Sequence, residues 1–227
     1  MADLSNQTSK PQLGRSSKEN RWYFKEIANH LPASRQLLEQ YSRIAPQDVD
    51  SHVYKLSQAP YPCVGEFKFL TLHLPSHPLY PTILTHLSPT PSRPQPKLLD
   101  LGCCVGQELR GLAHAGIPSQ NLYGSDLRAP YLSTSYALFK DRATFHGPLV
   151  PADIFSPTLF EQELAGWEST FDVVHAGLFL HLFSRPQQLH VCEKIVRLMN
   201  PAKGSLFVGE MVGCLGWWDP GAGERSG

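Results

Sequence analysis

The sequence predicts an α/β fold in which about five mostly parallel strands form a doubly wound sheet behind a helical N-terminal cap. Short apolar runs alternate with segments of helical spacing through residues 97–213, as in a parallel sheet with crossover helices. A proline-rich stretch separates this half from a first part with helical spacing of its own. Acidic residues follow the first three apolar runs, which places them at one edge of the sheet.

Composition limits the classes of partner. The chain has 227 residues, 41% of them hydrophobic, which is enough for one α/β domain with a helical extension. Twenty basic residues balance twenty acidic ones, so no overall charge draws the chain to nucleic acid or to an anionic membrane. The partner we expect is a small molecule.

Cysteine usage and the lack of long apolar runs indicate the compartment. The five cysteines are an odd number and include the adjacent Cys103 and Cys104, which does not fit a disulfide framework. No run reaches the roughly 18 apolar residues of a membrane span, and residues 1–19 lack the apolar core of a secretory signal. We therefore expect a reduced, soluble, cytoplasmic protein without a metal site.

The first part of the chain divides into a tail and a cap. Residues 1–19 are polar and aperiodic, so we expect a disordered tail. Residues 20–87 are expected to form a helical cap, in which Ser34 can cap one helix and Pro46 fits the first turn of the next. Residues 80–87 can form one further helix. The apolar positions expected on helix faces are Trp22, Tyr23, Phe24, Ile27 and Ala28, then Leu37, Leu38, Tyr41 and Ile44, then Val49, Val53 and Leu56.

Residues 88–96 form a linker. Four prolines in these nine residues exclude regular structure and mark a stiff boundary between cap and core. The core spans residues 97–213, and residues 214–227 form an irregular, glycine-rich tail. Residues 186–199 carry Leu189, Cys192, Ile195, Val196 and Met199 at helical spacing. The strands expected in the core are 97–101, 122–125, 144–150, 171–175 and 205–211, and the helices are 107–115, 129–139, 159–164 and 186–199.

A glycine-containing turn follows the first expected strand in Leu98-Leu-Asp-Leu-Gly-Cys-Cys-Val-Gly106. Asp100 ends the strand, and Gly102 and Gly106 let the backbone turn sharply and approach a ligand closely. Taken alone, such a turn also fits a tight strand–helix connection with no ligand.

Two further acids favour a ligand. Asp126 ends the second strand and Asp153 follows the third. Each alone would more often cap a helix than bind a ligand. Together with Asp100, however, they follow three successive strands and so meet at the carboxyl edge of the sheet, where such folds bind nucleotides. The three acids together predict a nucleoside site.

The turn also distinguishes between nucleosides. A dinucleotide site requires G-x-G-x-x-G, but position 104 is Cys, and Asp100 would repel a phosphate next to the turn. A cationic ligand without phosphate, such as S-adenosylmethionine with its sulfonium and amino groups, suits Asp100 better. A NAD-binding oxidoreductase is therefore disfavoured.

These motifs resemble the Rossmann-like class I S-adenosylmethionine-dependent methyltransferases. More narrowly, the chain resembles fungal methyltransferases of meroterpenoid pathways of the austinol, terretonin and andrastin type, over about residues 21–213. The strings that carry the resemblance are Arg21-Trp-Tyr-Phe, Leu31-Pro-Ala-Ser34, Tyr61-Pro-Cys-Val-Gly65, Asp100-Leu-Gly-Cys-Cys, Leu122-Tyr-Gly-Ser-Asp-Leu-Arg128, Phe171-Asp-Val-Val-His-Ala176 and Phe179-Leu-His-Leu-Phe183.

The resemblance implies specific cofactor contacts. Asp126 and Leu127 would hold the ribose and flank the adenine, while Asp153 and Ile154 would contact the adenine edge. The resemblance also implies a homodimer. The methionine end would lie against Asp100, Gly102, Cys103 and Gly106, above a floor of His175 and Ala176.

The acceptor implied by the resemblance is a carboxylate on a polyketide-terpenoid skeleton, which becomes a methyl ester. A carboxylate is ionised at neutral pH and needs no general base. Trp22, Tyr23 and Phe24 would cover this apolar substrate. His181 could orient the acceptor or take a proton from a phenol, although a packed histidine bonded to backbone is the alternative.

Three departures from the family pattern stand out. Cys104 replaces a glycine, and a small buried space-filler explains it better than a catalytic thiol. Residues 57–60 make a short connection. After the fifth strand the sequence lacks the helix and antiparallel strand pair of a complete fold. We therefore keep open a truncated, catalytically inactive protein of the same fold as the alternative to an active enzyme.

Overall fold

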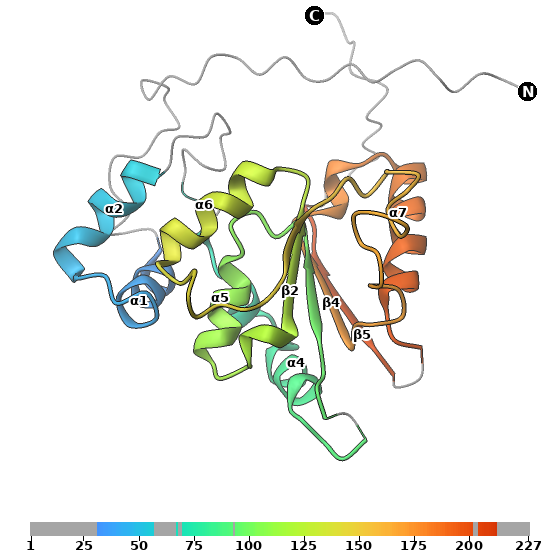
Figure 1. The fold of residues 1–227 in the computed structure, drawn as a ribbon, viewed down its shortest axis with the longest axis horizontal. Coiled ribbons are helices and arrows are strands. Elements are labelled where there is room, and N and C mark those ends of the chain that lie inside the picture. The colour runs from blue at the N-terminus through green and yellow to red at the C-terminus, as the bar shows by residue number, and fades with distance from the viewer. Residues whose placement is uncertain (1–30, 57–66, 68–69, 93, 202–203, 213–227) are drawn as a thin grey trace, which may run out of the picture.

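The computed structural model describes residues 31–56, 67, 70–92, 94–201 and 204–212. Five parallel strands form one sheet in the order β3-β2-β1-β4-β5, which confirms the predicted α/β class (Figure 1). The order places β1 at the centre, with β2 on one side and β4 on the other, and so produces a crevice at the carboxyl ends of the central strands. The strands are β1 (Leu98–Leu101), β2 (Leu122–Asp126), β3 (Leu149–Pro151), β4 (Val173–Gly177) and β5 (Leu206–Glu210).

Helices cover both faces of the sheet, as a doubly wound fold requires. On one face, α4 and α5 pack with Leu98, Leu122 and Val173 in a common core. On the other face, α7 packs with Leu99 and Val174. The described α-helices are α1 (Pro32–Gln40), α2 (Val49–Leu56), α4 (Tyr80–Leu87), α5 (Gln107–His114), α6 (Ala129–Phe139) and α7 (Arg185–Leu198), with short 3-10 turns η1 (Pro46–Asp48), η3 (Leu74–Ser76), η4 (Ser119–Asn121) and η5 (Leu180–Leu182).

The helix starts follow from local sequence. Proline occupies the first turn of α1, α4, α6 and α7, where its missing N–H has no intrahelical partner to lose. Ser184 and Gln187 form a capping box at the start of α7. The predicted cap at Ser34 is wrong, because Ser34 lies buried inside α1 and its hydroxyl donates to the Leu70 carbonyl. The predicted helices 80–87 and 129–139 have the bounds of α4 and α6.

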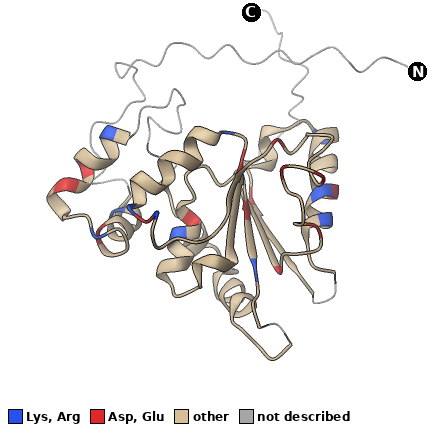
Figure 2. Ribbon diagram, viewed as in Figure 1, with Lys and Arg blue, Asp and Glu red and all other residues tan. Residues whose placement is uncertain are grey.

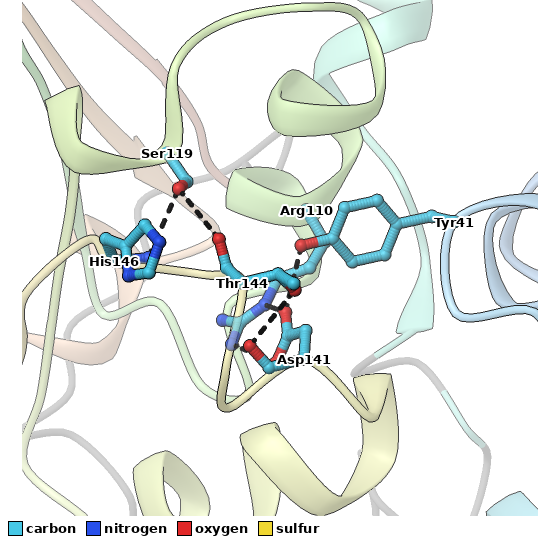
Figure 3. Close-up of polar contacts among 6 residues, drawn as sticks. All are labelled: Tyr41, Arg110, Ser119, Asp141, Thr144 and His146. Atoms are coloured by element: carbon cyan, nitrogen blue, oxygen red, sulfur yellow. Dashed lines mark hydrogen bonds and ion pairs between the residues drawn. The ribbon is translucent and has the colours of Figure 1, made fainter.

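The third strand is shorter than predicted. Of residues 144–150 only the last two belong to β3, because the earlier backbone groups bond within a loop instead of a ladder (Figure 3). The Ser119 hydroxyl donates to the Thr144 carbonyl at 3.3 Å and accepts from the His146 N–H at 3.1 Å. Pro148, which has no N–H, precedes the strand.

Two further predicted elements differ. Residues 159–164 form consecutive turns, not a helix: their N–H groups bond to carbonyls three, four and five residues back, as from Leu164 to Leu159. The fourth strand begins two residues later than predicted, at Val173, and Phe171 makes only an isolated bridge with Met199.

The buried face of α7 also differs from the expected set. Val191, Ile195 and Leu198 face the core, whereas Leu189 and Val196 are 64% and 68% exposed. Helical spacing alone identified the helix but not which of its two apolar stripes packs against the sheet.

Within the predicted cap, α1 and α2 lie beside α5 and α6 (Figure 1). The Tyr41 hydroxyl bonds Asp141, and His52 Nε2 lies 2.9 Å from the Leu138 carbonyl oxygen. By contrast α4 packs on the sheet. The expected aromatic helix at Trp22–Phe24 lies outside the described residues, as do the tails 1–19 and 214–227.

Charged residues of both signs are scattered over the described elements, in keeping with the balanced composition (Figure 2). Among the described helices, none combines the length and the apolar character needed to cross a bilayer.

A candidate nucleoside cavity at the carboxyl edge of the sheet

A cavity of about 550 Å³ opens where β1, β2, β3 and β4 end. This volume lies within the range of about 300–1,000 Å³ that small-molecule sites occupy. Polar groups gather at the ends of β2 and β3, and apolar groups come from the turns after β3 and β4. The lining residues are Leu101, Gly102, Cys104, Ser125, Asp126, Leu127, Arg128, Tyr131, Ala152, Asp153, Ile154, Phe155, Leu159, Leu164, Leu178, Phe179, Leu182 and Phe183.

Gly102 shapes the turn after β1. Its φ of +78° lies in the left-handed region, and a Cβ built there would lie 2.5 Å from Phe179 Cδ2. Only glycine fits both the backbone angle and the close approach of the aromatic ring. Gly106, with φ +67°, precedes α5 in the same way, and a Cβ there would lie 2.7 Å from Arg110 Nη1.

The N–H groups of the turn are already bonded within the protein. Those of Gly102 and Cys103 donate to the Ser125 carbonyl at 2.8 and 3.0 Å, and that of Gly106 donates to the Cys103 carbonyl at 2.7 Å. The Cys104 N–H donates to Asp126 Oδ2 at 2.8 Å. A dinucleotide site needs such amides for its pyrophosphate. The turn therefore suits a nucleoside without phosphates.

Asp126 is held in place by two backbone donors. Its Oδ2 accepts from Cys104, and its Oδ1 accepts from the Arg128 N–H at 2.8 Å. Burial raises the pKa of Asp126, while these two N–H groups act in the opposite direction. A half-buried, oriented carboxylate at the end of β2 can accept hydrogen bonds from the two hydroxyls of a ribose.

Asp153 begins the turn after β3. Its Oδ1 accepts from the Phe155 N–H at 2.9 Å, and its carbonyl accepts from the Ser156 N–H at 2.9 Å. These bonds fix a compact turn that places Ile154 and Phe155 against the cavity. The Asp153 carboxylate is exposed at the rim, where it can accept a hydrogen bond from an amino group.

Asp100 and His175 lie behind the cavity. Neither belongs to its lining; both are buried, and His175 Nδ1 lies 2.7 Å from Asp100 Oδ1. Burial lowers the pKa of His175, but the carboxylates of Asp100, Glu108 and Glu210 together outweigh it, so the pKa is raised. The structure thus places Asp100 as the partner of a histidine on the adjacent strand.

The structure brings five of the predicted cofactor residues together in the cavity lining. These are Gly102, Asp126, Leu127, Asp153 and Ile154. Asp100, Cys103, Gly106, His175 and Ala176 are buried near it without lining it.

His181 lies in η5, half-buried and outside the cavity lining. Its Nδ1 is buried and has no hydrogen-bond partner within the described part of the chain. Trp22, Tyr23 and Phe24 fall outside that part. The acceptor roles expected of these four residues stay predictions.

Sequence reasoning missed an aromatic wall on the apolar side. Phe179 and Phe183 contact edge to face with ring centroids 5.0 Å apart, and Phe183 meets Phe155 in the same way at 5.2 Å. The signals were present: Phe155 directly follows the predicted Ile154, and both other phenylalanines flank the singled-out His181. What was missing was the direction in which each side chain points.

Comparison with known proteins agrees with this geometry. A model of the meroterpenoid methyltransferase N-terminal domain matches residues 22–70, and a methyltransferase-domain model matches residues 99–208. The O-methyltransferase phiE of a fungus (Fungal sp.) is 40% identical over 92% of this chain and 68% of its own length.

Two further relatives are similar. The O-methyltransferase atr3 of Stereocaulon alpinum is 39% identical over 90% of this chain and 60% of its own length. The methyltransferase adrK of Penicillium roqueforti is 37% identical over 85% of this chain and 68% of its own length. The chain thus spans 60% to 68% of the length of these relatives. It belongs to the family of fungal S-adenosylmethionine-dependent methyltransferases that carry the meroterpenoid methyltransferase N-terminal domain.

Proposed function

We propose that the chain is an O-methyltransferase that binds S-adenosylmethionine in the cavity at the carboxyl edge and converts the carboxylate of a polyketide-terpenoid acid into its methyl ester. The observation that carries the proposal is the two-sided cavity. Oriented carboxylates stand on one side of it, and an aromatic and aliphatic wall stands on the other. The meroterpenoid N-terminal domain and the relatives named O-methyltransferases support the acceptor class.

The residues present fit the cofactor. The amides of the turn after β1 are bonded within the protein, which suits a ligand that has no phosphates, and two backbone donors hold Asp126 ready for a ribose. Asp153 would accept from the adenine amino group, and Ile154 would pack on the ring. When bound, the cofactor supplies an activated methyl group.

The apolar side suits a terpenoid acceptor. Leu178 and Leu182, at the rim, are 38% and 65% exposed, and Leu127 opposite is 60% exposed. Large apolar side chains that converge on one opening indicate a surface that an apolar ligand covers. The aromatic wall excludes water from a bound carboxylate, which strengthens its interactions and raises its reactivity.

A carboxylate acceptor suits the described lining, which contains no histidine, because such an acceptor needs no base. A carboxylic acid is ionised at neutral pH and attacks without losing a proton. The protein then has only to align and desolvate the acceptor. A phenol would instead need a proton acceptor within about 3 Å of its oxygen.

Transfer of a radiolabelled methyl group to a panel of terpenoid acids tests the proposal. The matched controls are the corresponding methyl esters and phenolic analogues. A methyl ester releases labelled methanol on mild alkaline hydrolysis, whereas a methyl ether does not. Alkali-labile label on the acids alone is expected. Label that resists alkali would identify a phenol or alcohol as the acceptor, and binding of S-adenosylhomocysteine without any transfer would favour the inactive alternative.

A further inference from the structure

Lys194 is a buried lysine on the inner face of α7. It is 8% exposed and lies on the same side of the helix as Val191, Ile195 and Leu198, which are almost fully buried. Lysine is rarely buried to this degree unless its ammonium group has a partner. The long stem packs among apolar neighbours, so the position of the charged end decides what the residue does.

The ammonium group holds the turn after β3. Lys194 Nζ donates to the Ser156 carbonyl over 3.2 Å, across 38 residues of sequence. Ser156 closes the turn that begins at Asp153: its N–H donates to the Asp153 carbonyl, and its hydroxyl lies 3.2 Å from that of Thr158. One end of the turn is thus fixed by β3 and the other by Lys194.

Burial, and after it the Arg197 cation, lower the pKa of Lys194. The carboxylates of Asp153, Glu161 and Glu163 favour the ammonium form and offset part of this effect. Asp153 is the member of this set at the rim of the cavity. The lysine is therefore linked to the adenine side of the proposed cofactor site through a hydrogen bond, and the Asp153 carboxylate attracts its ammonium group without direct contact.

We propose that Lys194 is a positioning residue for adenine recognition: by holding the Ser156 carbonyl, it fixes the turn that presents Asp153, Ile154 and Phe155 to the adenine. This proposal rests on the proposed binding of the cofactor in the cavity. Lys194 does not line the cavity. Its effect is on the place of the turn.

The test compares two ligands on the full chain by calorimetric titration. S-adenosylhomocysteine carries the adenine amino group, and S-inosylhomocysteine has a carbonyl in its place. In Lys194→Met the apolar stem stays and the ammonium is lost. We expect affinity for S-adenosylhomocysteine to fall about tenfold, the effect of losing one charge-assisted contact. Affinity for the inosine ligand should change much less, so discrimination between the ligands is lost.

Three further variants sharpen the result. Lys194→Arg, which restores a cation, should regain most of the discrimination. Asp153→Ala should lose it, and the double variant should bind S-adenosylhomocysteine no more weakly than Asp153→Ala alone, since both act through one turn. Lys55→Met, the same change on the exposed face of α2, should bind both ligands as the unaltered chain does. If Lys194→Met does not fold, Lys194→Gln, which keeps a shorter neutral donor, takes its place.

The outcomes separate this proposal from the one on which it rests. Equal losses for both ligands, or additive losses with Asp153→Ala, would show a general structural role and overturn the positioning role alone. Unchanged binding of both ligands in Lys194→Met would also overturn the positioning role. Failure of the unaltered, folded chain to bind S-adenosylhomocysteine would instead overturn the cofactor site, and the role of Lys194 with it.

Discussion

The Tyr41 hydroxyl donates a hydrogen bond to Asp141 Oδ2 at 3.0 Å and so joins α1 to the loop before β3, across 100 residues of sequence (Figure 3). The same carboxylate accepts from Arg110 Nε at 2.8 Å and from Nη2 at 3.2 Å. Arg110 is fully buried, with its guanidinium 3.9 Å from the centroid of the Phe145 ring. Asp141 is therefore the shared partner that attaches the N-terminal helices to the core.

Removing the Tyr41 hydroxyl and removing the Asp141 carboxylate should have unequal effects. Tyr41→Phe deletes one hydrogen bond from a partly exposed group, so we expect the free energy of unfolding to fall by about 1 kcal/mol. Asp141→Ala leaves the Arg110 charge buried without its carboxylate, which should cost about 3–5 kcal/mol. Urea unfolding followed by circular dichroism measures both. Equal losses in the two variants would contradict the central place of Asp141.

Glu108 should give the fold a pH dependence. Burial raises the pKa of Glu108 to about 7, against the His73 and Leu74 N–H groups, which donate to its carboxylate and favour the ionised form. A pKa that is higher in the folded state means that the folded protein binds the proton more tightly. The stabilisation is therefore full below the unfolded pKa and is lost as the pH rises through about 7.

The comparison is between the unaltered chain and Glu108→Gln, whose amide oxygen still accepts from the backbone. The free energy of unfolding of the unaltered chain should fall relative to that of the variant, by roughly 1 kcal/mol per pH unit between about pH 5 and pH 7. The other ionisable groups are the same in both proteins, so the difference between their stability curves reports on Glu108. A difference that stays constant over this range would refute the assignment.

Much of the core could be predicted because local and global signals agree there. The helix predicted at 129–139, between two short apolar runs, has the bounds of α6. The third strand failed because nothing in residues 144–150 shows that Ser119, from a distant turn, binds the backbone at Thr144 and His146. Tertiary hydrogen bonds of this kind are invisible to a period-two pattern.

The cofactor side of the site could be predicted for a topological reason. Residues that directly follow parallel strands must meet at the carboxyl edge, so Asp126 and Asp153 could be found from their order alone. Asp100 is the last residue but one of β1, but its side chain points to the α5 face and meets His175. Packing decides on which face of the sheet a side chain at a strand end lies, and which phenylalanines point into the cavity. The spacing of residues in the sequence does not encode this packing.

Gly102→Ala should damage both the fold and the site, and Gly166 offers a matched control. Both glycines have φ +78°, but a Cβ at Gly166 meets nothing within 4 Å, whereas one at Gly102 overlaps Phe179. Backbone strain alone should cost Gly166→Ala about 1–2 kcal/mol of unfolding free energy. Gly102→Ala should cost about 1–3 kcal/mol more, from the overlap.

The overlap also predicts a partial rescue. In the Gly102→Ala background, Phe179→Val removes the clashing Cδ2 and Cε2 atoms and should recover stability but not cofactor affinity, because the wall of the cavity is then changed. Thermal unfolding and titration with S-adenosylhomocysteine separate the two effects. Equal destabilisation by the two alanine variants would show that Phe179 yields without cost and that the close approach is unimportant.

Asp126→Asn tests the ribose contact, because it preserves size but removes the charge that accepts from both hydroxyls. Affinity for S-adenosylhomocysteine should fall about 10- to 100-fold, and the preference for that ligand over its 2′-deoxy analogue should disappear.

Burial raises the pKa of Asp126, and the ionised form is the one that binds. Affinity should therefore fall on acidification, starting at a higher pH than an exposed aspartate would give, and this dependence should be absent in the variant. A variant that weakens both ligands equally and keeps the pH dependence would place the ribose elsewhere. In that case the two backbone donors from Cys104 and Arg128 would hold Asp126 only to stiffen the turn.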